Sequence, residues 1–368
     1  MLNWVLELRP RHGVYLGQGC ANLAARYGHV EVVEVLMTLV PQHRRVYPDQ
    51  DAVNEAARHG HVGVVEPMKS RVPRQHRVYP EQYAVNEAAI RGHVGVVKIM
   101  ATLVPWQRVC PTQLAVNWAA ENGYVGVVEL MTTVVSEKRR VYPDRNAANC
   151  AARLGKLRIV KLMTTLVAEE HRVYPDQRAV NQAAWDGHAG IVELMAREMP
   201  EQHRIYPEQY VVNEAARLGK VRIVKLMTTL VPEKCRVYPD RNAINNAARY
   251  GHVKVVELMT RDVFEQHRVY PEEWAFVEAA RSGCVGMVRL MTTLVAEGRR
   301  VYPSQDAVNW VAWDGHVEVV RLMTIEVPEE RRVYPEEWTV NWAASRGHVE
   351  VVKLMTREVP EQHRVYSA

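Results

Sequence analysis

The fold is decided by a stretch of 32 residues, whose last copy, at residues 333–364, reads VYPEEWTVNWAASRGHVEVVKLMTREVPEQHR. Similar stretches recur along the chain, each opening with Val-Tyr or a variant of it, which is typical of stacked-repeat proteins. All copies have 32 residues except the third, which is one residue shorter. The sequence predicts eleven repeats, at residues 14–45, 46–77, 78–108, 109–140, 141–172, 173–204, 205–236, 237–268, 269–300, 301–332 and 333–364.

Little of the chain lies outside these repeats. Residues 1–13 are predicted to form an N-terminal capping segment, and residues 365–368 a C-terminal tail. Within a repeat, position 1 is the Val of Val-Tyr and position 32 is the closing Arg. The last repeat keeps an apolar outer face, although terminal repeats normally carry a polar one. Self-association through this uncapped end is therefore one expectation.

Each repeat predicts two helices. Pro at position 3 followed by an acid at position 4, as in Pro335 and Glu336, suits a helix start, because Pro tolerates the first turn and a carboxylate complements the helix dipole. Gly at position 15, such as Gly347, suits the left-handed residue that ends a helix. Apolar residues then follow helical spacing from position 17 to 27, and Pro360 at position 28 ends the second helix.

A single hairpin of this size cannot bury enough apolar surface to be stable alone. Small Ala residues on the first helix allow close approach of a neighbour, while Val, Leu and Met on the second helix fill the remaining volume. We therefore predict an all-α fold, a solenoid of stacked helix-turn-helix repeats.

The run from Ala343 to Met355, AASRGHVEVVKLM, and its counterpart from Ala56 to Met68 resemble the core of the ankyrin repeat. The resemblance covers residues 14–364 and implies ankyrin-like paired helices, a concave inner surface and a role in protein recognition. Two features depart from that family. Asn at position 9 replaces a His of the family motif, with Val277 breaking the Asn series, and the segment PEQHRVYP replaces the family's hairpin segment. Projecting β-hairpins are therefore not expected.

Positions 6, 10, 13 and 14 vary from repeat to repeat and fall within one arc of the first helix, opposite its Ala residues. Seven of the nine tryptophans occupy these positions, whereas a solvated face normally carries Lys, Glu and Ser. We predict a binding groove on this face, with its densest anchor at Trp310 and Trp313. The predicted partner-binding residues are Tyr83, Glu87, Trp118, Trp185, Asp186, Tyr210, Tyr250, Trp274, Trp310, Trp313, Asp314, Trp338 and Trp342.

The same face is also compatible with two origins that involve no ligand. One is sequence drift on a solvated surface, and the other is a set of aromatic rings that pack back between the helices. Indole rings sealed between neighbouring hairpins would contradict the predicted groove.

The ligand is predicted to be a protein or peptide, with single-stranded nucleic acid as the alternative. In that alternative the rings stack on bases and a ladder of arginines tracks phosphates. The arginines at position 32 are Arg45, Arg77, Arg108, Arg140, Arg172, Arg204, Arg236, Arg268, Arg300, Arg332 and Arg364. Against it, the variable face carries nine acids and nine arginines, and an acid four residues on, such as Glu81 after Arg77, is an expected partner for the ladder.

An enzyme is not expected. Seven of the fifteen histidines recur at position 16, as at His61 and His348, and this periodicity indicates a hydrogen bond at the start of each second helix rather than converging metal ligands. The sequence holds no HExxH, GxSxG or P-loop motif. We predict no catalytic residue, no cofactor and no metal site.

Composition bounds the remaining possibilities. With 48% hydrophobic and 24% charged residues, the chain is typical of a folded protein. No apolar run is long enough for a membrane span, so a membrane partner is not expected, and the opening MLNWVLELRPRHG is too polar for a signal peptide. The five cysteines fall at non-equivalent positions, which disfavours a disulfide framework. We expect an intracellular protein of the cytoplasm, with the nucleus as an alternative.

Overall fold

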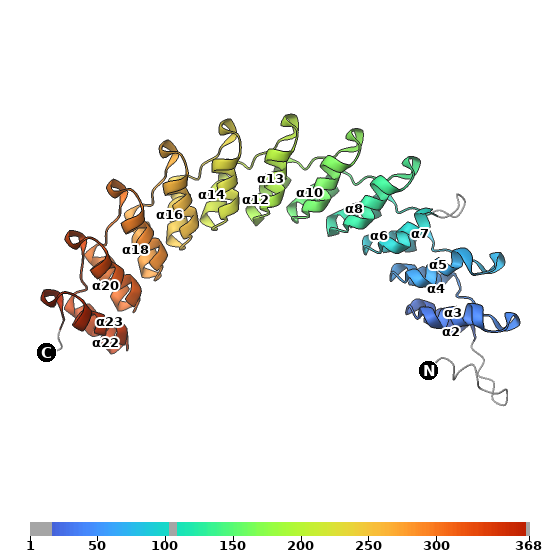
Figure 1. The fold of residues 1–368 in the computed structure, drawn as a ribbon, viewed down its shortest axis with the longest axis horizontal. Coiled ribbons are helices and arrows are strands. Elements are labelled where there is room, and N and C mark those ends of the chain that lie inside the picture. The colour runs from blue at the N-terminus through green and yellow to red at the C-terminus, as the bar shows by residue number, and fades with distance from the viewer. Residues whose placement is uncertain (1–16, 103–108, 366–368) are drawn as a thin grey trace, which may run out of the picture. The chain divides into compact units, whose positions relative to one another are not determined.

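The computed structural model describes residues 17–102 and 109–365. The chain divides into two compact units, Met1–Ala179 and Val180–Ala368, called here the first and second unit. Each unit is a series of helical hairpins with the predicted period (Figure 1). The prediction of an all-α solenoid of stacked helix-turn-helix repeats is confirmed. The capping segment predicted at residues 1–13 and residues 366–368 of the tail lie outside the described residues.

The first helix of each repeat starts near position 5 and ends shortly before the Gly at position 15. Within a unit, consecutive first helices lie side by side, for example α14, α16, α18, α20 and α22 (Figure 1). The first helices are α2 (Gln18–Arg26), α4 (Gln50–Arg58), α6 (Gln82–Ile90), α8 (Gln113–Asn122), α10 (Arg145–Arg153), α12 (Gln177–Asp186), α14 (Gln209–Arg217), α16 (Arg241–Arg249), α18 (Glu273–Arg281), α20 (Gln305–Trp313) and α22 (Glu337–Ser345).

The second helices begin shortly after the Gly. They are α3 (Val30–Glu34), α5 (Val62–Ser70), α7 (Val94–Thr102), α9 (Val125–Glu129), α11 (Leu157–Lys161), α13 (Ala189–Glu193), α15 (Val221–Lys225), α17 (Val253–Glu257), α19 (Val285–Arg289), α21 (Val317–Arg321) and α23 (Val349–Lys353). Within the described residues, nine of these helices continue into a π-helical turn, such as Leu322–Glu326 after α21. In that turn the backbone N–H of Val327 donates to the Leu322 carbonyl at 3.1 Å.

The core of each unit is built from the residue types that the sequence predicts. In the second unit Phe276, Leu322 and Met323 are fully buried with the Ala and Val residues of the first helices. In the first unit Val53, Val64 and Met68 fill the same role. The Gly at position 15 has a positive φ in all eleven repeats, as the helix-ending prediction requires.

An asparagine ladder joins successive repeats inside each unit. Asn309 Oδ1 accepts from the backbone N–H of Glu336 in the next repeat at 3.0 Å, and Asn309 Nδ2 donates to Glu336 Oε2 at 3.1 Å. We call this pair of hydrogen bonds a joint. The bond from the backbone N–H to the Asn Oδ1 is present at nine joints, at 2.8–3.2 Å, with acceptors Asn22, Asn54, Asn86, Asn117, Asn149, Asn181, Asn213, Asn245 and Asn309. Position 9 therefore ties the first helix to the start of the next one.

Histidines at position 16 contact the preceding repeat, which corrects the expectation of a bond at the start of their own helix; the contact is made by His61, His93, His252, His316 and His348. The side chain of His61 makes no bond to the start of α5. Its ring lies over Gly28 of the preceding repeat and is hydrogen-bonded to the backbone of Arg26. A Cβ at Gly28 would come within 2.4 Å of this ring, so Gly provides the space as well as the turn.

Candidate binding surface on the first helices

The predicted aromatic residues of the second unit are displayed to solvent. The exposed fractions are 43% for Trp274, 46% for Trp310, 49% for Trp338 and 50% for Trp342, while Trp313 is half-buried. Their positions lie opposite the Ala residues that pack the first helices together, and those Ala side chains are fully buried. The rings are therefore not sealed between hairpins.

Four of these indoles form one cluster across α20 and α22, which we call the Trp cluster: Trp310, Trp313, Trp338 and Trp342. Trp313 is its centre, because its ring centroid lies 6.2 Å from that of Trp310, 6.0 Å from that of Trp338 and 4.9 Å from that of Trp342. The contact with Trp342 is stacked, and that with Trp338 is edge-on. The cluster gathers a continuous aromatic patch from two adjacent repeats.

Arginines lie over two rings of the Trp cluster. The guanidinium carbon of Arg346 is 4.8 Å from the Trp313 centroid, and that of Arg281 is 5.1 Å from the Trp310 centroid. Arg281 also pairs with Glu278 at 3.1 Å, and Arg346 lies 4.0 Å from Asp314. These arginines are thus already engaged by rings and carboxylates.

Trp274 extends the aromatic surface to α18. Its indole N–H donates to Glu272 Oε2 at 2.9 Å, and this bond, together with those from Asn245 and Arg241, lowers the pKa of Glu272. Trp338 makes the equivalent bond to Glu336. With their polar edges already paired, both indoles offer mainly ring carbons to a ligand.

Four other predicted residues of the second unit are exposed on earlier helices, whereas the exposed Asp314 follows Trp313 at the end of α20. Trp185 and Asp186 end α12, where Gln182 donates to Asp186 at 2.9 Å. Tyr210 on α14 accepts from Asn181 at 3.3 Å, and Tyr250 lies beside Arg249, whose guanidinium carbon is 5.7 Å from the ring.

In the first unit, the predicted residues are more scattered. Tyr83 on α6 and Trp118 on α8 are exposed. Glu87 is half-buried and pairs with Arg91 at 3.3 Å. Among the ring contacts of the described residues, no Trp of the first unit meets another Trp, so the aromatic patch is concentrated in the second unit.

The arginines at position 32 bond to the backbone of their own repeat, which corrects the expectation that they pair with the acid four residues later. Arg332 Nε donates to the Val327 carbonyl at 3.1 Å, and the same bond at position 32 recurs in every described repeat. Arg77 donates to Val72 rather than pairing with Glu81, which instead accepts from Asn54. These half-buried arginines close the end of the second helix. Arg108 lies outside the described residues.

Sequence reasoning missed an open pocket of about 410 Å³ on the second unit, lined by Arg249 of α16 and by Trp274, Val277 and Glu278 of α18. Trp274 was among the predicted residues, but its three companions were not. The available signal was Val277 itself, the residue that breaks the Asn series at position 9.

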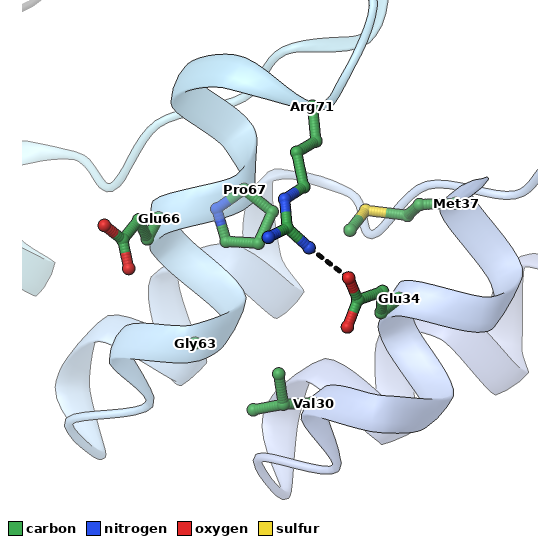
Figure 2. A pocket seen from close by; sticks show the side chains of 7 residues that line it. All are labelled: Val30, Glu34, Met37, Gly63, Glu66, Pro67 and Arg71. Carbon is green, nitrogen blue, oxygen red and sulfur yellow. Dashed lines mark hydrogen bonds and ion pairs between the residues drawn. The ribbon is translucent and has the colours of Figure 1, made fainter.

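A second pocket, of about 320 Å³, lies on the first unit between α3 and α5 (Figure 2). Pro67 lines it at a position where the other repeats have Leu, Ile or Val, and Pro cannot donate the helical hydrogen bond to Gly63. An ion pair between Arg71 and Glu34 crosses it, as the dashed line in Figure 2 shows. This pocket lies on the second helices, away from the predicted aromatic face.

Across residues 17–102 and 109–365, no three His, Cys, Asp or Glu side chains are arranged to share a metal ion. In the same residues, no helix combines the length and the apolar character needed to cross a bilayer.

Comparison with known proteins finds no matching protein-family model, and no curated protein matches the sequence. Among solved structures, the chain is similar to the pentatricopeptide repeat protein PPR10 from maize, with 17% identity, a TM-score of 0.32, and coverage of 96% of this chain and 56% of PPR10. PPR10 in complex with an 18-nt psaJ RNA element matches with 16% identity and a TM-score of 0.33, over 93% of this chain and 54% of that one.

A third solved structure is c5321, a protective antigen of uropathogenic Escherichia coli with an SLR fold, at 12% identity and a TM-score of 0.17, over 94% of this chain and 83% of c5321. The chain thus spans about half the length of PPR10. The present chain is a helical-repeat protein.

Proposed function

We propose that the exposed face of the first helices binds a polypeptide segment, and that the Trp cluster is its anchor. The main support is the contact of three indoles, each about half exposed, with the ring of Trp313. Covering the exposed half of one such ring removes on the order of 80 Å² of apolar surface from water, which is worth about 2 kcal/mol before ordering costs. Clustered aromatic rings of this kind are the usual hot spots of protein interfaces.

The charges around the cluster support a polypeptide over a polyphosphate. Arg281 and Arg346 are paired with Glu278 and Asp314, so little uncompensated positive charge faces the ligand. The ladder arginines, which would have tracked phosphates, donate to carbonyls of their own repeats instead. The ankyrin-like core of the repeats, a proposal of kinship that rests on the sequence alone, agrees with a role in protein recognition.

Single-stranded RNA is the second candidate, favoured by the open faces of Trp310 and Trp342 and by the guanidinium of Arg281 beside Trp310. Bases stack on such platforms without sequence preference. RNA binding of this kind would weaken steeply with salt, whereas anchoring of apolar side chains would not.

The test uses peptides selected against the full chain from a random display library, with affinities measured by calorimetry. Replacing both Trp310 and Trp342 by Ala is expected to weaken the selected peptides at least about tenfold, because each ring contributes more than the 1.4 kcal/mol that a tenfold change represents. The matched control is Phe264→Ala, since Phe264 is a 59% exposed aromatic residue in a loop of the same unit.

Unchanged affinity of the double Trp variant would contradict the proposal. The parallel arm titrates U20 and A20 RNA at low and high salt. Salt-sensitive RNA binding that disappears in the double Trp variant, in a protein that selects no peptide, would establish the second candidate instead.

A further inference from the structure

One joint of the asparagine ladder differs from the others, the joint between α18 and α20. Position 9 of the repeat at 269–300 is Val277, whereas the other ten repeats have Asn there. The residue 27 positions later, which receives the joint, is Ser304 rather than an acid. Both partners of the joint have therefore departed from the repeat pattern together.

The Val, and not the Ser, removes the joint. At the only other place without an acid, Asn86 still accepts from the backbone N–H of Thr112 at 2.9 Å. A Val side chain has no acceptor for the equivalent N–H of Ser304. Ser304 keeps its other role, since its hydroxyl caps α20 by accepting from Ala307 at 3.3 Å.

What the Val adds is an apolar lining for the pocket of about 410 Å³ on the exposed face. Trp274 lines the same pocket, and its indole N–H is already donated to Glu272, so ring carbons remain for contact. The charged lining consists of Arg249 and Glu278, whose side chains lie 3.7 Å apart. The pocket thus combines an apolar surface with one hydrogen-bond donor group and one acceptor group.

We infer that this pocket, which we call the Val277 pocket, receives one apolar side chain of the polypeptide proposed above, and the inference rests on that proposed function. A peptide bond carries one acceptor and one donor beside each side chain, which matches the pair of Arg249 and Glu278 beside the apolar lining. The net charge of that lining is zero, as an uncharged peptide bond requires. The ligand segment therefore carries a large apolar residue, such as Leu, Met or Phe, that lies in the Val277 pocket while other residues meet the Trp cluster.

Nucleic acid suits this pocket poorly. Glu278 lines the pocket, and the exposed Glu272 accepts a hydrogen bond from Trp274 of the lining. Arg241 pairs with Glu272, and Arg249 and Arg281 pair with Glu278, so the pocket offers no uncompensated positive charge to a phosphate backbone, whereas an uncharged peptide backbone needs none.

The test is a double-mutant cycle between Val277 and the selected peptides, with the full chain. Each apolar residue of a peptide is replaced in turn by Ala, and the affinity of every peptide is measured for the wild type, Val277→Asn and Val277→Ile. Val277→Asn restores the repeat pattern and offers the Ser304 N–H an acceptor, so the variant should fold with an equal or higher thermal midpoint. Val277→Ile keeps the pocket apolar.

We expect Val277→Asn to weaken the parent peptide about tenfold or more and to abolish the effect of Ala at one particular apolar position, while Val277→Ile retains both. If the Val277→Asn variant binds the peptide with full affinity while the double Trp variant binds it more weakly, the Val277 pocket is overturned and the proposed function stands. If Val277→Asn weakens binding of the peptide and the double Trp variant does not, the Val277 pocket is supported and the Trp anchor is overturned. Selection of no peptide, with RNA bound in its place, overturns both.

Discussion

At the scale of single residues, the histidines at position 16 link stability to pH. The pKa values of His61, His93 and His252 are lowered from 6.5, chiefly because each ring is partly buried against the preceding repeat. For His93 the nearby charge of Arg91 lowers the pKa further. The unfolded chain then binds more protons than the folded one, so the stability from these rings is complete above pH 6.5 and is lost as the pH falls through and below that value.

The corresponding prediction is that the thermal midpoint falls when the pH is lowered from about 7.5 to about 5.5, a range in which ordinary carboxylates stay ionised. Replacing His61, His93 and His252 by Tyr should reduce this fall. Tyr is a suitable replacement because Tyr124 occupies the same position against Gly92 in another repeat. Differential scanning calorimetry at both pH values measures the effect. An identical fall in the wild type and the triple variant would show that these rings are not its source.

The same residues show what sequence reasoning can reach. Periodicity at position 16 correctly indicated a structural role, but the partner was assigned to the wrong helix, because a one-repeat pattern carries no information about which neighbour a side chain faces. Arg332 illustrates the same limit, since its partner is a backbone carbonyl, which leaves no mark in the sequence. Exposure of the Trp residues was predictable, because the buried Ala positions determine the opposite face of the helix.

At the scale of elements, the asparagine ladder orients each first helix on the next. Asn245 is fully buried and exchanges two hydrogen bonds with Glu272 of the following repeat, at 2.8 and 2.9 Å. Asn245→Ala should therefore lower the free energy of unfolding by about 1–3 kcal/mol, because it removes both partly buried hydrogen bonds to Glu272. Urea unfolding followed by circular dichroism measures the change.

The neighbouring residue provides the control for this prediction. Asn246 is similar in size and in the same helix, but its side chain bonds only to the carbonyl of Asn242 at 2.9 Å. Asn246→Ala should change the free energy of unfolding by less than about 0.5 kcal/mol, as is usual for surface positions. Equal effects of the two substitutions would refute a specific role for the ladder.

The asparagine ladder could have been predicted from a correlation between position 9 of one repeat and position 4 of the next. Asn at position 9 is followed 27 residues later by an acid at each joint except that of Asn86, which is followed by Thr112, and Val277 and Ser304 depart together. The π-helical turns were not predictable in this way. Seven of the nine described turns have a Thr at position 24, such as Thr324, whose hydroxyl donates to the Val320 carbonyl at 2.8 Å, but the other two have Met37 and Ala196 there, and local Thr bonds of this type also occur in ordinary helices.

At the scale of the whole molecule, stability in a repeat protein is close to a sum of repeat and joint contributions. Within the second unit the joint between α18 and α20 lacks its ladder bond, so the repeats that follow it should open more readily than an unbroken ladder would allow. Native-state hydrogen exchange can resolve this. The combined substitution Val277→Asn and Ser304→Glu should slow amide exchange in α20 to α23, and unchanged exchange there would mean that the joint contributes nothing.

The helix-turn-helix order and the exposed face followed from periodicity alone, because both depend on spacing within one repeat. The Val277 pocket did not, since it is formed by α16 and α18 together and by a departure from the pattern rather than by the pattern.

The hydrogen bonds and close contacts that recur between neighbouring repeats use positions 2, 4, 5, 9, 15 and 16, whereas the proposed ligand face uses positions 6, 10, 13 and 14 and adds position 9 only at Val277, where the ladder bond is missing. Apart from Val277, folding and selectivity therefore depend on different positions of the same 32-residue unit. Exchanging one whole repeat for another between ladder asparagines preserves the adjoining contacts while replacing the ligand face. In-frame duplication, deletion or exchange of whole repeats during evolution can therefore change the bound ligand while the fold is preserved.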